Sequence, residues 1–152
     1  MRLRKKLIVL SSLIGVVFIL FYLYFWLIDY KTTISVTGGE NPTFKFSGSG
    51  RLIDFALIGP RQRPGNGRNS FTIWELKPTS DSAEGEFVGI LGPIEYGIVP
   101  KGYMQVYPEH DASPPPLRSG EKYLVQAITN NAPWGQIQFE IREGKAIETQ
   151  VK

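Results

Sequence analysis

The chain has 152 residues, of which 17 are basic, 14 are acidic and none is cysteine, so its formal charge is +3. Four of the basic residues lie in segment 1–6 (MRLRKK), and residues 7–152 carry 13 basic against 14 acidic residues, a net charge of −1. A folded part without a basic excess argues against nucleic-acid binding. The absence of cysteine excludes disulfide bonds and a lipid-modified cysteine.

The first element is an apolar run at residues 7–28 (LIVLSSLIGVVFILFYLYFWLI), without a charge, amide or proline. As a helix rising about 1.5 Å per residue it would span roughly 33 Å, close to the hydrocarbon thickness of about 30 Å. A cleavable signal peptide is the alternative, but its apolar part is usually about 7–15 residues and ends at small residues. This run ends in the bulky sequence FWLI. We therefore expect an uncleaved transmembrane signal anchor.

The flanking charges predict the direction of this anchor. Basic residues precede the run in segment 1–6, and such residues remain on the cytoplasmic side. We expect a single-pass protein of the bacterial inner (plasma) membrane, with a cytoplasmic N-terminus and a periplasmic or extracellular C-terminal domain. The bacterial assignment follows from the lack of both cysteine and an Asn-x-Ser/Thr sequon, because an animal cell-surface domain often carries one of them.

The residues after the anchor predict an all-β domain. Short β-rich runs are separated by Gly, Pro, Asn and Ser, which is typical of sandwiches. We expect a juxtamembrane segment and first strand at 29–42, a β-sandwich at 43–148 and a tail at 149–152. The expected strands are Thr32–Thr37, Thr43–Phe46, Leu52–Ile58, Phe71–Leu76, Phe87–Leu91, Ile94–Val99, Tyr103–Tyr107, Tyr123–Thr129 and Gln136–Arg142.

Two of these runs alternate apolar and polar residues with a period of two. This pattern predicts strands with one buried and one exposed face, and two such sheets packed together form a sandwich. The residues expected to point inward are Ile53, Phe55 and Leu57 in the third run, and Ile137, Phe139 and Ile141 in the last. Asp54 and the charged residues of the last run are expected to point outward.

The segment from Leu117 to Ala127 reads LRSGEKYLVQA. It resembles the L-x-x-G-x-x-Y-x-V-x-A run of fibronectin type III and related immunoglobulin-like domains, with matches at Leu117, Gly120, Tyr123, Val125 and Ala127. In that family the tyrosine side chain bonds back to the backbone a few residues upstream, forming the tyrosine corner. The resemblance implies an immunoglobulin-like β-sandwich with this bond at Tyr123. It implies no activity.

The rest of the domain departs from the fibronectin pattern. It is longer than the usual length of about 100 residues, and it lacks a cysteine pair. The middle stretch YGIVPKGYMQVYP and the late GKAI resemble segments of uncharacterised bacterial envelope proteins. That second resemblance carries no function with it.

Two sets of side chains are candidates for binding a partner. The loop RQRPGNGR holds Arg61, Arg63 and Arg68, which suit phosphate or carboxylate groups; a solvated loop is the alternative. The turn-rich segments hold Tyr96, Tyr103, Tyr107 and Trp134. Exposed aromatics near loops bind sugars or partner proteins, and the alternative is that these rings cap the ends of the core.

No pattern in the sequence predicts catalytic, metal-binding or cofactor-binding residues. His110 is the only histidine, and one histidine does not make a metal cluster or a Ser-His-Asp system. We therefore expect a membrane-tethered binding or structural module, such as an immunity or accessory protein of the cell envelope, with a protein or envelope polymer as its partner. The alternative is an envelope enzyme acting on cell-wall or lipid material, for which Glu75, Glu95 and His110 are the candidates.

Overall fold

The computed structural model describes residues 12–24, 31–60, 71–82 and 84–149. The chain divides into two compact units, Met1–Tyr30 and Lys31–Lys152. In the first unit residues 12–24 are helical, and the described residues include no helix with the length and apolarity needed to cross a membrane. The remaining parts of the expected helix at 7–28 lie outside the described residues.

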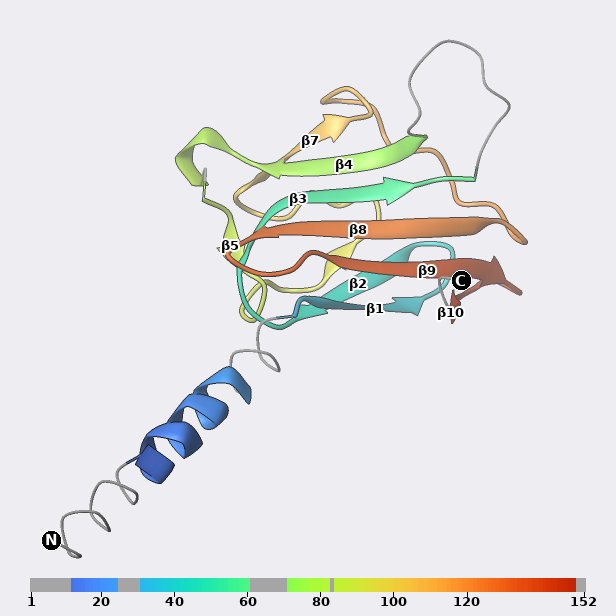
Figure 1. The fold of residues 1–152 in the computed structure, drawn as a ribbon. Helices are drawn as coiled ribbons and strands as arrows, with labels where there is room; N and C mark the ends of the chain where they lie inside the picture. The colour runs from blue at the N-terminus through green and yellow to red at the C-terminus, as the bar shows by residue number, and fades with distance from the viewer. Residues whose placement is uncertain (1–11, 25–30, 61–70, 83, 150–152) are drawn as a thin grey trace, which may run out of the picture. The chain divides into compact units, whose positions relative to one another are not determined.

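In the described residues of the second unit, the regular secondary structure is almost entirely β-strand and forms two sheets, as predicted (Figure 1). One sheet has the order β1-β2-β6, and the other has the order β10-β9-β8-β3-β4-β7, with β5 paired to the first residues of β3. The strands are β1 (Thr33–Gly38), β2 (Pro42–Ser47), β3 (Arg51–Ile58), β4 (Thr72–Pro78), β5 (Glu86–Phe87), β6 (Ile94–Glu95), β7 (Tyr103–Tyr107), β8 (Lys122–Asn130), β9 (Gly135–Arg142) and β10 (Lys145–Thr149), with one 3-10 turn, η1 (Ser80–Ser82).

The two sheets pack face to face around an aromatic core. The ring of Phe44 in β2 lies 5.3 Å from that of Phe55 in β3 and 5.9 Å from that of Phe139 in β9. Trp74 in β4 adds edge-to-face contacts at 5.5 Å to Phe55 and 5.4 Å to Tyr96. Offset and edge-to-face rings are favoured over stacked sandwiches, so these contacts hold the sheets in one arrangement.

The buried face of β3 differs from the predicted alternation. The pairing of β3 with β8 shifts register between Leu52 and Asp54. Leu52 is consequently buried and Ile53 only half-buried, whereas Phe55 and Leu57 are buried as predicted. A bulge adds one residue to one strand and changes which face the following side chains occupy. The prediction that Ile53 points into the core was therefore wrong.

Strand β9 follows its predicted alternation with one exception. Phe139 and Ile141 are buried and Ile137 is half-buried. Glu140 is also buried, although it was expected to be exposed. The guanidinium of Arg142 covers its carboxylate through two hydrogen bonds of 2.8 Å each, so a neighbour on the same face shields Glu140 from solvent.

Three strands have lengths that the sequence did not predict. The runs expected at Phe87–Leu91 and Ile94–Val99 contribute strands of two residues each, β5 and β6. Strand β10 was missed. Glu143 and Gly144 have φ values of 50° and 70°, as a tight two-residue hairpin turn requires, and this turn directs β10 back along β9.

Candidate functional site

An open cleft of about 820 Å³ lies at the end of the domain where β3 and β7 begin. Its lining comes from four segments: the first residue of β3, the η1 turn, β5 with its flanking residues, and the turn before β7. These segments are distant in the sequence and meet only through the pairing of β5 with β3 and of β7 with β4. The tertiary fold therefore creates this cleft.

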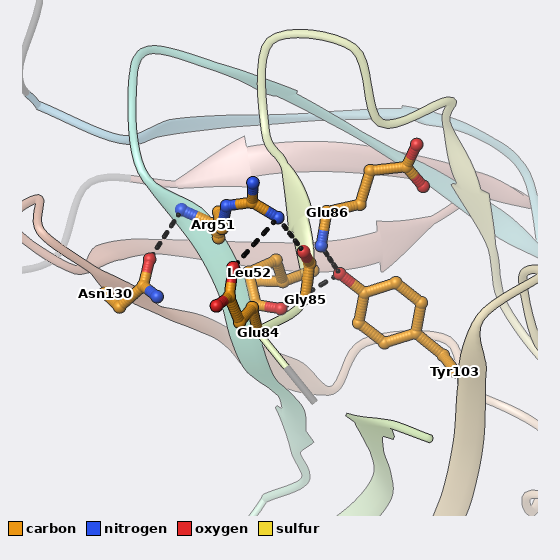
Figure 2. Close-up of polar contacts among 7 residues, drawn as sticks. All are labelled: Arg51, Leu52, Glu84, Gly85, Glu86, Tyr103 and Asn130. Atoms are coloured by element: carbon orange, nitrogen blue, oxygen red, sulfur yellow. Dashed lines mark hydrogen bonds and ion pairs between the residues drawn. The ribbon is translucent and has the colours of Figure 1, made fainter. Parts of the chain in front are cut away.

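Tyr103 forms a fixed wall of the cleft (Figure 2). Its hydroxyl donates to the carbonyl oxygen of Leu52 at 2.9 Å and accepts from the backbone N–H of Glu86 at 3.1 Å. Burial raises the pKa of the Tyr103 hydroxyl. The hydrogen bond from the backbone N–H of Glu86 lowers this pKa, and the negative charge of Glu86 raises it. The phenol therefore stays protonated and ties β3, β5 and β7 together.

Gly85 allows the segment before β5 to approach β3. Its φ is +70°, and a Cβ at this position would collide with the carbonyl of Leu52. A residue with a side chain could not adopt this conformation in the available space. The close approach also directs the carbonyl oxygen of Gly85 toward the side chain of Arg51, as Figure 2 shows.

Arg51 presents its guanidinium at the cleft. Nη1 donates to the carbonyl oxygen of Gly85 at 3.0 Å and lies 3.6 Å from a carboxylate oxygen of Glu84. The guanidinium carbon lies 4.3 Å from the centroid of the Phe87 ring. Within the part of the chain that the structure describes, the polar contacts of the Arg51 guanidinium involve Nη1. Nε and Nη2 can therefore donate to an oxygen of a ligand.

The rim of the cleft combines both charges with apolar groups. Lys101 adds a second cation, and Asp81, Glu84 and Glu86 supply carboxylates. The side chain of Phe87 is 48% exposed. This mixture suits a ligand that has both charged and apolar groups, such as a segment of protein, better than a uniformly charged polymer.

A second polar cluster lies on the exposed face of the larger sheet. The ammonium of Lys77 lies 2.8 Å from a carboxylate oxygen of Glu75 and 3.8 Å from Oδ2 of Asp54, and Oδ1 of Asp54 is buried without a hydrogen-bond partner. Burial raises the pKa of Asp54, as does the charge of Glu75, while Lys77 opposes both. The hydrogen bond that Lys77 donates to Glu75 raises the pKa of Lys77. One cation thus balances two carboxylates here.

The described residues include no group of three or more His, Asp or Glu side chains arranged to hold a metal ion. The three residues considered for an enzyme also lie on separate elements: Glu75 in β4, Glu95 in β6 and His110 in the loop after β7. Nδ1 of His110 lies 2.9 Å from the carbonyl oxygen of Gln105, so this histidine takes part in the local loop structure.

The predicted aromatic candidates separate into two pairs. Tyr96 and Tyr103 are buried, and the Tyr96 hydroxyl donates to the carbonyl oxygen of Pro115 at 2.6 Å. Burial raises the pKa of Tyr96. Both rings therefore belong to the core, which was the alternative left open by the sequence. Tyr107 and Trp134 are 49% and 54% exposed. The arginine candidates Arg61, Arg63 and Arg68 lie outside the described residues.

Sequence reasoning missed Arg51, Phe87 and Lys101 as neighbours in one cleft. Phe87 was expected to begin a strand that runs to Leu91, whereas β5 ends at this residue. The only local signal was glycine at position 85, before a short apolar run. No spacing rule connects that glycine with Arg51, because the pairing of β5 with β3 brings them together.

No protein-family model, curated protein or solved structure matches this chain.

Proposed function

We propose that this protein is a membrane-anchored binding module of the bacterial cell envelope, with residues 31–152 outside the inner membrane. The cleft beside Arg51 is the observation that carries the proposal. The anchor is supported by the charge-free run at 7–28 and the basic segment 1–6 before it. Apart from Ser12 and Gly15, the described helical residues 12–24 have exposed large hydrophobic side chains, and a helix that is hydrophobic all round suits a membrane environment.

We assign the domain to the immunoglobulin-like sandwiches. The sheet β1-β2-β6 corresponds to strands A, B and E of that fold, and β9-β8-β3-β4 corresponds to G, F, C and C′. The tyrosine-corner bond supports this assignment: the backbone N–H of Arg118 donates to the hydroxyl of Tyr123 at 2.7 Å, and Tyr123 stands at the start of β8, the F position. The departures are β5, β7 and β10, which add pairings at the margins of the larger sheet.

The ligand class follows from the chemistry of the cleft. Among the described residues, the polar contacts of the Arg51 guanidinium involve Nη1, which leaves Nε and Nη2 next to an aromatic ring and near Lys101. This arrangement suits a carboxylate adjacent to an apolar side chain. An acidic and apolar segment of a partner protein has these groups. An immunity protein or an accessory subunit of an envelope complex would bind a partner in this way.

The test uses the full chain in bacterial cells with a photo-crosslinking amino acid at Lys101 or Phe87. The control position is Ile147 on β10, which is 43% exposed. We expect a discrete adduct from the two cleft positions, and we expect Arg51→Ala to abolish it. Arg51→Lys should restore it only in part, because lysine keeps the charge and loses the planar fork.

The matched background control is Arg118→Ala, which removes an exposed arginine side chain outside the cleft. This variant should leave the adduct unchanged. Equal adducts from Ile147, or adducts at the cleft that persist in Arg51→Ala, would show that the cleft is not the binding site.

A further inference from the structure

The first residues of the second unit meet three segments that are distant in the sequence. The backbone N–H of Thr32 donates to the carbonyl oxygen of Pro133 at 3.4 Å. The hydroxyl of Thr32 donates to the carbonyl oxygen of Ser49 at 3.3 Å. The backbone N–H of Val88 donates to the carbonyl oxygen of Gly50 at 3.0 Å. The β2–β3 turn, the residues after β5 and the β8–β9 turn therefore surround the start of the domain.

These segments form one surface, which we call the anchor-proximal surface and define as Lys31, Gly48, Gly89, Ile90, Pro133 and Trp134, all exposed. Two glycines permit the close packing. A Cβ on Gly48 would collide with the carbonyl of Lys31, and a Cβ on Gly89 would lie 3.5 Å from the carbonyl oxygen of Gly48. The surface is thus held together by backbone contacts.

The anchor-proximal surface exposes large apolar side chains to solvent. Ile90 is 73% exposed and Trp134 is 54% exposed, and Lys31 is its only charged member. Exposed apolar groups gathered on one surface indicate contact with a partner or a membrane. A tryptophan and a lysine beside an aliphatic side chain are typical of the interface between lipid and water.

The covalent chain limits how far this surface can lie from the proposed anchor. Two residues separate Ile28, the last residue of the apolar run, from Lys31. The three Cα-to-Cα steps between Ile28 and Lys31 span at most about 11 Å when fully extended. The interfacial layer on each side of the hydrocarbon core is about 5–8 Å thick. Lys31 therefore stays within or just beside that layer whatever path the intervening residues take.

We propose that the anchor-proximal surface binds the interfacial layer of the bilayer that holds the anchor, with Trp134 and Ile90 in contact with lipid. The inference rests on the proposed function, because it requires the anchor at residues 7–28. It also defines where the partner is bound: Ile90 lies on the rim of the cleft, so the cleft opens next to the membrane. The partner segment then belongs to the membrane-proximal part of another envelope protein.

The chain contains no cysteine, which makes single-cysteine labelling straightforward. We would label Ile90→Cys and Trp134→Cys with the fluorophore NBD in the full chain, reconstituted in vesicles of phosphatidylethanolamine and phosphatidylglycerol. The control is Ile147→Cys. Ile147 pairs with Glu140, which lies five residues along β9 from Gly135. At the rise of a strand, Glu140 is about 17 Å from Gly135, so the control position lies away from Trp134.

The proposal predicts blue-shifted NBD emission at positions 90 and 134, with quenching by lipids brominated on their acyl chains. Position 147 should emit as in water and resist quenching. Ile90→Asp should reduce the quenching of the label at 134, because it places a charge in the layer. Equal, water-like emission at all three positions would overturn the inference.

Flotation of the vesicles after an alkaline wash separates this inference from the proposed function. A chain that floats but has water-like labels at 90 and 134 keeps its anchor, and only the bilayer contact is refuted. A chain that does not float has no anchor, and both proposals fail. A photo-crosslinker at Trp134 should give lipid adducts in cells; protein adducts in their place would assign this surface to a protein and overturn the proposal.

Discussion

Two tryptophans of this domain occupy opposite environments. Trp74 is completely buried, meets the rings of Phe55 and Tyr96, and donates its indole N–H to Gln105 at 2.8 Å. Trp134 is 54% exposed on the anchor-proximal surface. The residue type is the same, so the difference comes from partners supplied by other strands. Large apolar side chains therefore have to be assigned to the core or to a binding surface from their neighbours.

The largest expected contrast is between the two variants that each remove one indole. Trp74→Ala should lower the free energy of unfolding by about 3–5 kcal/mol, because it leaves a cavity between the sheets. Trp134→Ala should change it by no more than about 0.5 kcal/mol. Denaturant unfolding of the full chain in detergent micelles, followed by circular dichroism, would measure both. Similar losses for the two variants would invalidate the comparison.

The second contrast concerns the polar partner of the buried indole. Gln105 accepts from Trp74 and donates to the carbonyl oxygens of Pro108 and Ala112 at 3.0 and 2.7 Å. Gln105→Leu leaves the buried indole N–H of Trp74 unpaired and removes the two hydrogen bonds to the loop, and it should cost about 1–3 kcal/mol. Faster hydrogen exchange in residues 108–112 should accompany the loss. The control Gln136→Leu, at an exposed position of β9, should show neither effect.

A smaller effect is expected at the tyrosine corner. Tyr123→Phe removes the acceptor for the backbone N–H of Arg118 but keeps the ring, which stacks on Phe139 at 5.5 Å. We expect a loss of about 0.5–1.5 kcal/mol, the usual contribution of one hydrogen bond. Tyr107→Phe, at an exposed ring, is the matched control and should be neutral. Equal stability of the Tyr123→Phe variant and the natural chain would show that the corner bond contributes nothing.

The smallest effect concerns pH and the exposed sheet face. The pKa of Asp54 is raised above its ordinary value of 3.8 in the folded state, mainly by burial. The folded state therefore binds the proton more tightly than the unfolded state, and stability should fall as pH rises from that value through the folded pKa. Asp54→Asn should remove this slope, whereas Asp111→Asn in an exposed loop should keep it. Urea midpoints between about pH 3 and 7 would test this.

Several elements could be predicted because their signals are local. The alternation of β9, the glycine and tyrosine spacing of the corner, and the turn-rich runs between strands all lie within short segments. The hairpin turn before β10 had a similar local signal in Glu143 and Gly144, and could have been found. The bulge in β3 could not, because it appears only in the register of β3 against β8.

The sequence by itself determined the all-β class, most strand positions and the charge-free run at 7–28, because each depends on periodicity or spacing between near neighbours. The resemblance of segment 117–127 to the fibronectin type III run implied the tyrosine-corner bond. The tertiary structure decided which aromatics are buried and which are exposed, how Arg51 meets Phe87, and which turns surround Lys31. These features depend on backbone pairing between segments far apart in the chain, and such pairing leaves no pattern in any single segment.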